Sequence, residues 1–433
     1  MAFQALGIVL IVLIFLLAIG VPISYAIGIS SLAAILAVVP LDVSVLTAAQ
    51  RTFVAMSKFS LTAIPFFILA GNLMNRGGIA KRLVDFVLAI LGKLPGSLLV
   101  TNVGANGLFG AISGSASAAA AAVGSMVREG EEEQGYDPAL CAATNGASAP
   151  SGLLIPPSNA LITYSLVSGG TSVAALFLAG YIPGILWALC CIVVAVILAK
   201  KRGYQGTPGK FDWKTLGVAT VRAIPSLSLI VVVIGGIIAG IFTATEGSAI
   251  AVVYALVLGI FYKNITVKSF WRIVVDSAKM SGMIVFLIGV SNILGWVMAF
   301  TQIPQAISNA LLGVTTNPII ILLIMNLILL VAGTFMDVTP AILIFTPLFL
   351  PIVKTFGMSP VQFGLILVYN LCIGNITPPV GNTLFVAIKV GRTTLAKVMP
   401  YMLLYYGAIL VGLLLVTYVP FISLGLPNLV GLL

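Results

Sequence analysis

The sequence has no histidine and few charged residues. None of its 433 residues is His, and only 7% are Asp, Glu, Lys or Arg, against about 25% in soluble domains. Without an imidazole, the chain lacks the commonest ligand of transition metals, the commonest general base and the usual nucleophile relay. We therefore expect no enzymatic activity, no cofactor and no transition-metal site.

Cysteine is also scarce. The four cysteines are Cys141, Cys190, Cys191 and Cys372, and their spacing matches neither a metal site nor a redox motif. They are expected to be small buried hydrophobic residues.

Apolar sequence dominates instead. Hydrophobic residues make up 60% of the chain, in successive runs long enough to cross about 30 Å of hydrocarbon. The net charge of +10 is spread through short loops, which argues against nucleic acid as a partner. The first run, from Phe3, lacks a basic flank and a cleavage site, so it is interpreted as a retained span. The sequence predicts an all-α polytopic protein of the lipid bilayer.

Ten spans are predicted, in two sets of five. They cover residues 3–20, 21–39, 60–75, 137–168 and 173–199, then 224–240, 241–262, 280–298, 359–388 and 398–424. Segments 97–128 and 318–353 each hold two short apolar arms around a polar tip, at 113–117 and 336–340, and are interpreted as re-entrant hairpins. Segments 42–58 and 263–279 are too polar to span, so they are interpreted as helices along the interface or, for the first, equally as a connecting loop.

Two of these spans should be broken helices. After Gly152 and again after Gly374, an apolar run meets Pro-Pro, in GLLIPPSN and GNITPPVGN. Proline lacks an N–H and clashes with the preceding turn, so each pair frees carbonyl groups from helix bonding. In a bilayer such carbonyls are tolerated only inside protein or along a cavity, where they can hold a cation. Paired broken helices are typical of secondary transporters.

The two halves of the chain repeat one another. Equivalent landmarks lie 220 to 223 residues apart: Gly20 and Gly240, Asn72 and Asn292, Gly110 and Gly333, Pro138 and Pro360, Gly152 and Gly374, Pro156 and Pro378. Because each repeat has an odd number of spans, the second repeat, 223–433, should be inverted relative to the first, 1–222. Loops on one side, at 76–93, 128–136, 200–222, 263–279 and 389–397, hold 18 of the 21 basic residues. That side is therefore expected to be cytoplasmic, with both termini periplasmic.

Several long motifs resemble a known family. IPFFILAGNLMNRGGIAKRL, GLFGAISGSASA, GIFTATEGSAIAVVYAL and DVTPAILIFTPLFLPIV, with both Pro-Pro segments, resemble the DctM-like (SiaM-like) large membrane subunit of tripartite ATP-independent periplasmic (TRAP) transporters. The resemblance covers nearly the whole chain. It implies an elevator fold, in which hairpins and broken helices, about 97–168 plus 318–390, form a transport domain and the remainder a scaffold.

The same resemblance implies how the protein works. It implies sodium coupling, a small four-helix membrane subunit as partner, a periplasmic substrate-binding protein that delivers an organic anion, and a place in the bacterial inner membrane. One segment departs from the family pattern: REGEEEQ, at 128–134, is unusually acidic. It is interpreted as a solvated cytoplasmic turn outside the site.

The hairpin tips and helix breaks supply the candidate site residues. Hydroxyl and carbonyl oxygens suit a hard cation such as sodium, and half-helix N-termini suit a carboxylate. Close helix packing is the alternative role for the serines. We predict two sodium sites, one from Ser113, Ser115, Gly152, Ile155 and Pro157, the other from Gly333, Asp337, Thr339, Gly374 and Thr377.

Substrate is expected between the two tips. Ser117, Asn159 and Asn382 are the candidate contacts, because amides can donate to a carboxylate. Capping of the resumed helices is an equal alternative for both asparagines.

Few charged residues interrupt the apolar sequence. Asp337 lies at a hairpin tip, whereas Glu246 begins a span and is interpreted as a scaffold or subunit contact. A proton relay is the rival role for both acids, although neither has a His or a second acid nearby in the sequence. The loop residues Arg51, Arg76 and Arg392 are expected to orient the chain or contact lipid headgroups.

These features favour the large permease subunit of a sodium-coupled, binding-protein-dependent importer of a small organic acid, such as a sialic acid or a C4-dicarboxylate. A stand-alone sodium-coupled dicarboxylate symporter is the nearest alternative. A non-transporting membrane anchor of a complex is the alternative from another class.

Overall fold

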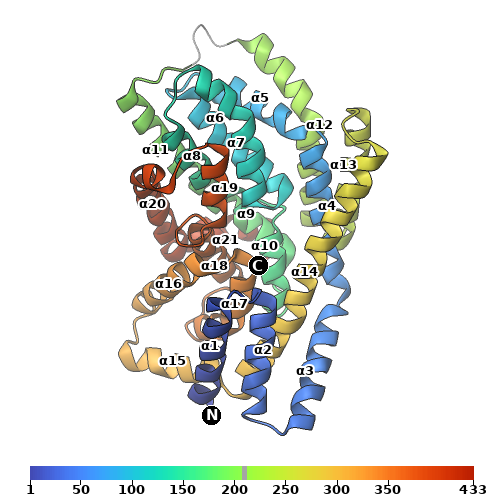
Figure 1. Ribbon diagram of the computed structural model, residues 1–433, viewed down its shortest axis with the longest axis vertical. Helices are drawn as coiled ribbons and strands as arrows, with labels where there is room; N and C mark the ends of the chain where they lie inside the picture. The colour runs from blue at the N-terminus through green and yellow to red at the C-terminus, as the bar shows by residue number, and fades with distance from the viewer. Residues whose placement is uncertain (207–211) are drawn as a thin grey trace.

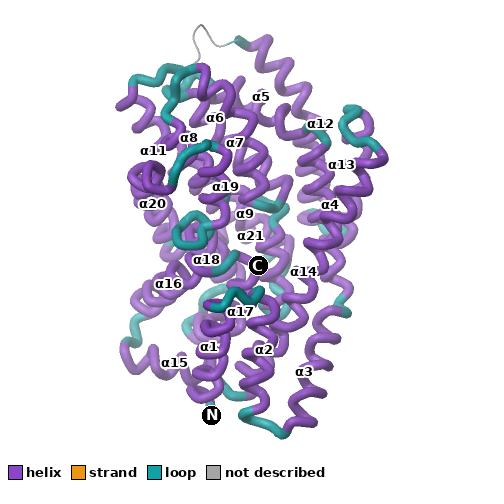
Figure 2. Tube along the Cα trace, in the orientation of Figure 1, coloured by secondary structure: helices purple, strands orange, loops and turns teal. Residues whose placement is uncertain are grey.

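The computed structural model describes residues 1–206 and 212–433. Within these residues, helices are the only regular secondary structure (Figure 2). Seven helices are long and apolar enough to cross a membrane: α11 Val173–Arg202, α12 Trp213–Ile238, α13 Ala244–Phe261, α14 Val267–Phe300, α16 Pro318–Phe335, α17 Val338–Thr355 and α20 Leu395–Tyr418. Four shorter helices are also apolar: α1 Ala2–Ala18, α2 Ile23–Leu36, α18 Pro360–Gly374 and α21 Pro420–Val430. The protein is a multi-pass membrane protein.

Two helical hairpins occupy segments 97–128 and 318–353, but the arms of the second, α16 and α17, are not short as the sequence predicts, because each is long enough to cross a membrane. The first joins α6 Ser97–Ser113 to α7 Ala116–Glu133, and the second joins α16 to α17. Gly114 turns the first tip with φ of +63°, a left-handed conformation in which a Cβ is strained.

Two helices are interrupted at the double prolines, where the sequence predicts breaks. The first runs from α8 Pro138–Ser148 through the single turn α9 Ser151–Leu154, breaks, and resumes as α10 Asn159–Val167. The second breaks after α18 and resumes as α19 Asn382–Val390. Both Pro-Pro bonds are cis.

The long helices α12, α13 and α14 stand with their neighbours as a column beside the hairpins, which is called the long-helix column below (Figure 1). In this column α14 packs against α2, α3 Leu41–Met56 and α4 Ala63–Arg76, and α13 packs against α4. Helix α3 is bent by 58° from the continuous segment Phe59–Arg76, which comprises the 3-10 turn Phe59–Thr62 and α4. Helix α4 contacts α6, and α14 contacts α17, so the column touches both hairpins.

The structure corrects the prediction for 263–279. This segment is not a separate interface helix, because α14 runs without a break through Phe300. The polar first turns of α14 lie at the end of the molecule, where Asp276 forms a salt bridge with Arg76. Segment 42–58, by contrast, does form a helix of its own, α3.

Three further helices lie outside the predicted spans. Helix α5 Ile79–Leu91 occupies a segment expected to be a loop, and it buries Ile79, Leu83 and Val87 on one face at four-residue spacing. The others are α15 Ile303–Val314 and the terminal α21.

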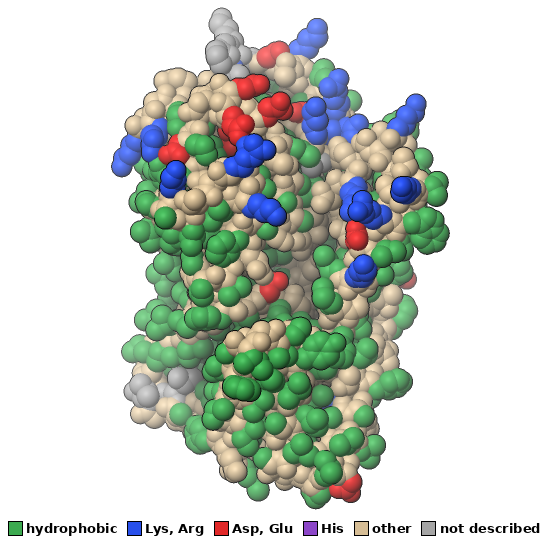
Figure 3. Space-filling view, viewed as in Figure 1, with side chains coloured by type: hydrophobic (Ala, Val, Ile, Leu, Met, Phe, Trp, Pro, Cys, Tyr) green, Lys and Arg blue, Asp and Glu red, His purple; other side chains and the backbone are tan. Residues whose placement is uncertain are grey.

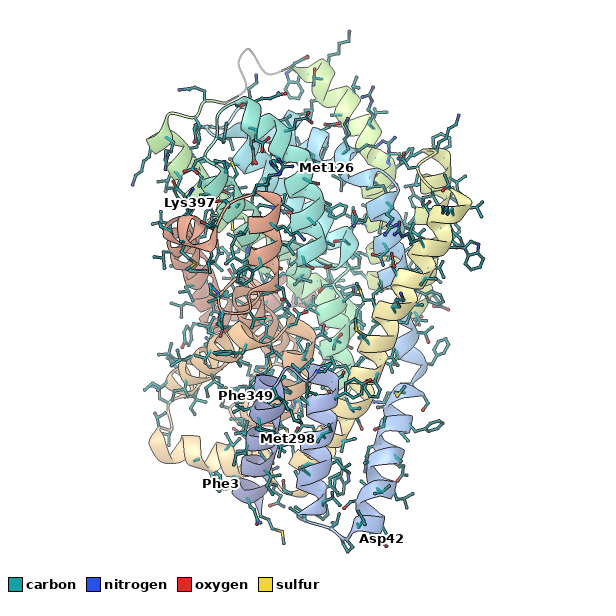
Figure 4. All side chains as sticks on the ribbon, in the orientation of Figure 1. Phe3, Asp42, Met126, Met298, Phe349 and Lys397 are labelled. Carbon is teal, nitrogen blue, oxygen red and sulfur yellow. The ribbon has the colours of Figure 1, made fainter. Side chains whose placement is uncertain are left out.

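Charge is gathered at one end of the molecule. The visible Lys, Arg, Asp and Glu side chains crowd the upper end in Figure 3, whereas the lower half is largely apolar. Figure 4 places Met126 and Lys397 toward that charged end and Phe3 and Asp42 toward the opposite one.

Candidate functional site

The first hairpin tip is a cluster of hydroxyl groups. Ser115 caps α7, where its Oγ accepts a hydrogen bond from the Ala118 N–H at 3.3 Å and lies 3.2 Å from Ser117 Oγ. Ser113 is buried, and its Oγ makes only long contacts, 3.4 to 3.5 Å, with the carbonyls of Ser115 and Gly110. Ser113 and Ser115 thus present oxygen atoms at one turn.

The first helix break lies directly against this tip. A Cβ on Gly152 would lie 2.2 Å from the Gly110 Cα, so the two backbones touch and leave no room for a side chain. A Cβ on Gly114 would lie 2.6 Å from Asn159 Nδ2, which places that amide beside the tip. Because Pro156 has no N–H, the Gly152 carbonyl has no helical donor four residues on. The structure therefore places the break that holds Gly152 against the end of the hairpin arm that leads to Ser113.

Ser158 stabilises the chain on both sides of the first helix break. Its hydroxyl donates to the Leu153 carbonyl and accepts from the Leu161 N–H, so it closes one half-helix and caps the next. Ile155 and Pro157 are half-buried between these two ends.

The second tip and break repeat this arrangement. A Cβ on Gly374 would lie 2.3 Å from the Gly333 carbonyl carbon, and the Val380 N–H donates to the Thr334 carbonyl at 3.2 Å. Asp337 caps α17, because its Oδ1 accepts from the Val338 N–H at 2.8 Å. The tip and the break are thus joined by backbone contact.

Hydroxyl groups also line the second break. Thr377 Oγ1 donates to the Ile373 carbonyl at 2.7 Å, and Tyr406 donates to the Ile376 carbonyl at 2.6 Å. Asn375 Oδ1 is buried without a hydrogen-bond partner in the described part of the chain. Thr339 is half-buried and is the second residue of α17.

Of the three predicted substrate contacts, the structure groups only two. Ser117 and Asn159 both lie at the first tip, whereas Asn382 is exposed at the start of α19 and bonds to no other described side chain. Asn382 does not cap α19, because no side chain does.

The two interrupted helices contact each other. Cys372 Sγ in α18 lies 3.9 Å from the Pro150 carbonyl, just before α9. These two residues are 222 positions apart, the spacing that separates the two double prolines. All four cysteines are free thiols; Cys141, Cys191 and Cys372 are buried as expected, whereas Cys190 is only partly buried.

Asparagines on the hairpin arms are site residues that the sequence analysis missed. Asn106 Nδ2 of α6 lies 2.9 Å from both Asn145 Oδ1 and Ser148 Oγ of α8. In the second half, Asn370 Nδ2 of α18 donates to Asn326 Oδ1 of α16 at 2.8 Å. Each amide fixes a hairpin to its interrupted helix. An asparagine inside an apolar run of the sequence indicates such hydrogen bonds between helices.

The acidic segment at 128–134 is the clearest departure from expectation. It is not a solvated turn, because α7 continues to Glu133 and Glu131 is only 6% exposed. Burial raises the pKa of Glu131 from 4.5 to about 7, against the lowering effects of Cys141 and of the Arg128 charge. Arg128 itself pairs with Glu132 and donates to the Val390 carbonyl, which ties α7 to α19.

This burial predicts how stability depends on pH. Because the folded protein holds its Glu131 proton to higher pH than the unfolded chain does, stability should fall from pH 4.5 to about 7 and then level off. At 1.4 kcal/mol per pKa unit the loss is about 3 kcal/mol. Thermal unfolding of Glu131→Gln in detergent should lack this dependence and exceed wild type at pH 8. Glu132→Gln is the control. If the stability of Glu131→Gln fell with pH as steeply as that of Glu132→Gln, the assignment of this pH dependence to Glu131 would be contradicted.

Two of the other charged residues singled out, Glu246 and Arg76, have structural partners. Glu246 accepts hydrogen bonds from Thr243 N and Oγ1 at 2.7 and 2.9 Å, so it caps α13 and is no part of the hairpin site. Arg76 forms a 2.9 Å salt bridge with Asp276 of α14, and its side chain stays 44% exposed. Among the described residues, no group of three His, Cys, Asp or Glu is placed to hold a metal.

Two adjoining cavities separate α10 from the long-helix column. One of about 170 Å³ is lined by Lys58, Leu166, Gly169 and Asn292, among others. The second, of about 420 Å³, shares Lys58, Leu166 and Gly169 and extends to Thr243. Lys58 therefore gives both cavities a positive charge.

Apolar helices and two hairpin tips against two helix breaks define a polytopic membrane protein of the transporter class. A solved transporter supports the fold: the YdaH transporter of Alcanivorax borkumensis superposes with a TM-score of 0.59 at 16% identity, covering 85% of this chain and 87% of that one. The chain belongs to the family of the DctM component of the tripartite ATP-independent periplasmic transporters, whose model matches residues 10–422. The resemblance drawn from the motifs is thus confirmed.

Curated relatives agree with this family. The chain is 50% identical to the uncharacterized protein YgiK of Salmonella typhimurium, over 96% of this chain and 95% of that one. It is 38% identical to the C4-dicarboxylate TRAP transporter large permease protein DctM of Rhodobacter capsulatus, over 97% and 98%. It is 40% identical to the isethionate TRAP transporter permease protein DctMQ of Oleidesulfovibrio alaskensis, over 94% of this chain and 64% of that longer protein. The two relatives with a named function, DctM and DctMQ, are transporter permeases rather than enzymes.

Proposed function

We propose that the protein is the large permease subunit of a sodium-coupled importer of a small organic anion, working by an elevator movement in the inner membrane. The observation that carries this proposal is the contact of each hairpin tip with a helix break, through Gly110 and Gly152 and through Gly333 and Gly374. Such junctions concentrate unpaired carbonyls and half-helix ends at one depth, which is how transporters hold ions and carboxylates. In this proposal, segments 97–168 and 318–390 move as the transport domain against the remaining scaffold.

The inverted repeat is part of this proposal. Where two related halves meet on a two-fold axis, equivalent positions contact one another, and Pro150 and Cys372 are such a pair. Gathering of the basic loops at one end supports placing that end in the cytoplasm and both termini in the periplasm.

Sodium is proposed to bind at both junctions. Hydroxyl and carbonyl oxygens of Ser113, Ser115, Gly152, Ile155 and Pro157 would supply one site, and those of Gly333, Asp337, Thr339, Gly374 and Thr377 the other. Ser117 and Asn159 would bind the substrate carboxylate, and the exposed Asn382 would join them when the second tip approaches.

The proposed partners follow from the family and from the fused relative. A small membrane subunit and a periplasmic substrate-binding protein would complete the transporter, and the DctMQ relative carries extra length beyond the match. The substrate would be a compact acid, such as a C4-dicarboxylate, a sialic acid or a sulfonate like isethionate.

Reconstitution tests the function. We expect proteoliposomes holding both membrane subunits to take up labelled anion only with an inward sodium gradient and a ligand-loaded binding protein. A control with equal potassium should show no uptake above background. Uptake by the large subunit alone would favour the stand-alone symporter, and failure of every loaded binding protein to support uptake would favour the membrane anchor.

A further inference from the structure

A basic cavity lies at the charged end, away from the hairpin site. It measures about 360 Å³ and is lined by Gly78, Lys81, Arg82, Asp85, Arg222 and Asn264. Three cations against one carboxylate leave it a net positive charge. The cavity sits between α5 and α12, which pack together, and beside the loop that joins α13 to α14.

The cations of this cavity have no salt-bridge partner. Arg76, Arg128 and Arg202 each pair with a carboxylate, whereas Lys81, Arg82 and Arg222 form no salt bridge with any described residue. Their charges are therefore available to an external anion.

The cavity wall is fixed in place. The Arg82 guanidinium lies 3.3 Å from the centre of the Tyr262 ring, a cation–π contact that limits its movement. Asn264 Nδ2 donates to the Gly77 carbonyl at 3.0 Å, beneath Gly78. Gly78 has φ of +77°, and a Cβ there would lie 2.0 Å from Asn264 Nδ2. The turn and the loop thus form a prearranged wall rather than a loose surface.

An apolar strip continues from the cavity along α12. Val218 and Val232 are each 46% exposed, and their spacing from Arg222 puts them on the same side of the helix as that cavity residue. A soluble anion in the cavity would make no contact with this strip. The acyl chains of a lipid whose phosphate fills the cavity would lie along it. We propose that this cavity binds the phosphodiester headgroup of an anionic phospholipid. This role goes beyond the proposed transport function and does not depend on it.

Native mass spectrometry tests the site without any transport assay. Wild type should retain phosphatidylglycerol in preference to phosphatidylcholine, and Lys81→Ala/Arg222→Ala should bind it about tenfold more weakly. The matched control Lys268→Ala/Arg272→Ala removes the same charge from exposed positions outside the cavity and should bind like wild type.

Three results would overturn the proposal. The first is equal phosphatidylglycerol binding by both double variants. The second is competition by inorganic phosphate at the same concentration as lipid, which would indicate a soluble anion. The third is loss of the lipid when the small membrane subunit is added, which would make the cavity a subunit interface.

Discussion

Gly152→Ala should lower sodium-driven uptake at least about tenfold and reduce the free energy of unfolding by about 1–3 kcal/mol. The added Cβ would lie 2.2 Å from the Gly110 Cα and 2.4 Å from its carbonyl carbon, where backbone rather than a flexible side chain must move. Because that movement separates the hairpin from the helix break, the first sodium site should open as well. Melting temperature in detergent and uptake in proteoliposomes measure the two effects.

A helical glycine elsewhere provides the control. Gly282 in α14 has no atom within 4 Å of a Cβ, so Gly282→Ala should be neutral or slightly stabilising. Gly374→Ala should behave like Gly152→Ala, because its Cβ would lie 2.3 Å from the Gly333 carbonyl carbon. Equal melting temperature and equal uptake of Gly152→Ala and Gly282→Ala would show that the close contact between Gly152 and Gly110 does not matter.

Ser115→Ala and Thr377→Ala should each weaken sodium activation of uptake by about tenfold, the effect of losing an interaction of about 1.4 kcal/mol. Each removes one hydroxyl at a proposed sodium site, the first at a hairpin tip and the second at a helix break. The double variant should lose sodium dependence almost entirely. The sodium concentration for half-maximal uptake is the measurement.

Both substitutions also remove ordinary hydrogen bonds, so matched controls are needed. Ser172 caps α11 as Ser115 caps α7, accepting from the N–H three residues on at 3.2 Å against 3.3 Å. Thr301 Oγ1 donates to the carbonyl four residues back at 2.7 Å, as Thr377 does. Ser172→Ala and Thr301→Ala should lose similar stability but keep wild-type sodium activation. If Ser172→Ala and Thr301→Ala weaken sodium activation of uptake as much as Ser115→Ala and Thr377→Ala do, the assignment of Ser115 and Thr377 as sodium ligands is wrong.

The sequence predicts the features of this fold that depend on local backbone chemistry. Proline cannot continue a helix, so the two Pro-Pro pairs predict both interruptions without knowledge of the packing. The small residues beside Gly114 predict a tight hairpin tip, because glycine can adopt the left-handed backbone conformation that such a turn needs. The family followed from motifs spread along the whole chain.

Features that depend on tertiary contacts were not predictable in the same way. Glu131 looks solvated in its acidic run, and only the packing around α7 buries it. Segment 263–279 looks too polar to extend a span, but Asp276 finds Arg76 across the column. Asn106 and Asn370 are visible in the sequence, but their partners come from other helices.

The inverted repeat is the central claim, and impermeant thiol labelling tests it most directly. Glu133 and Thr355 end α7 and α17, are both exposed, and lie one repeat spacing apart. In a background free of the four native cysteines, Glu133→Cys should react only from the cytoplasmic face of membrane vesicles and Thr355→Cys only from the periplasmic face. Labelling of both positions from the same face would contradict the inverted arrangement and the transport mechanism that rests on it.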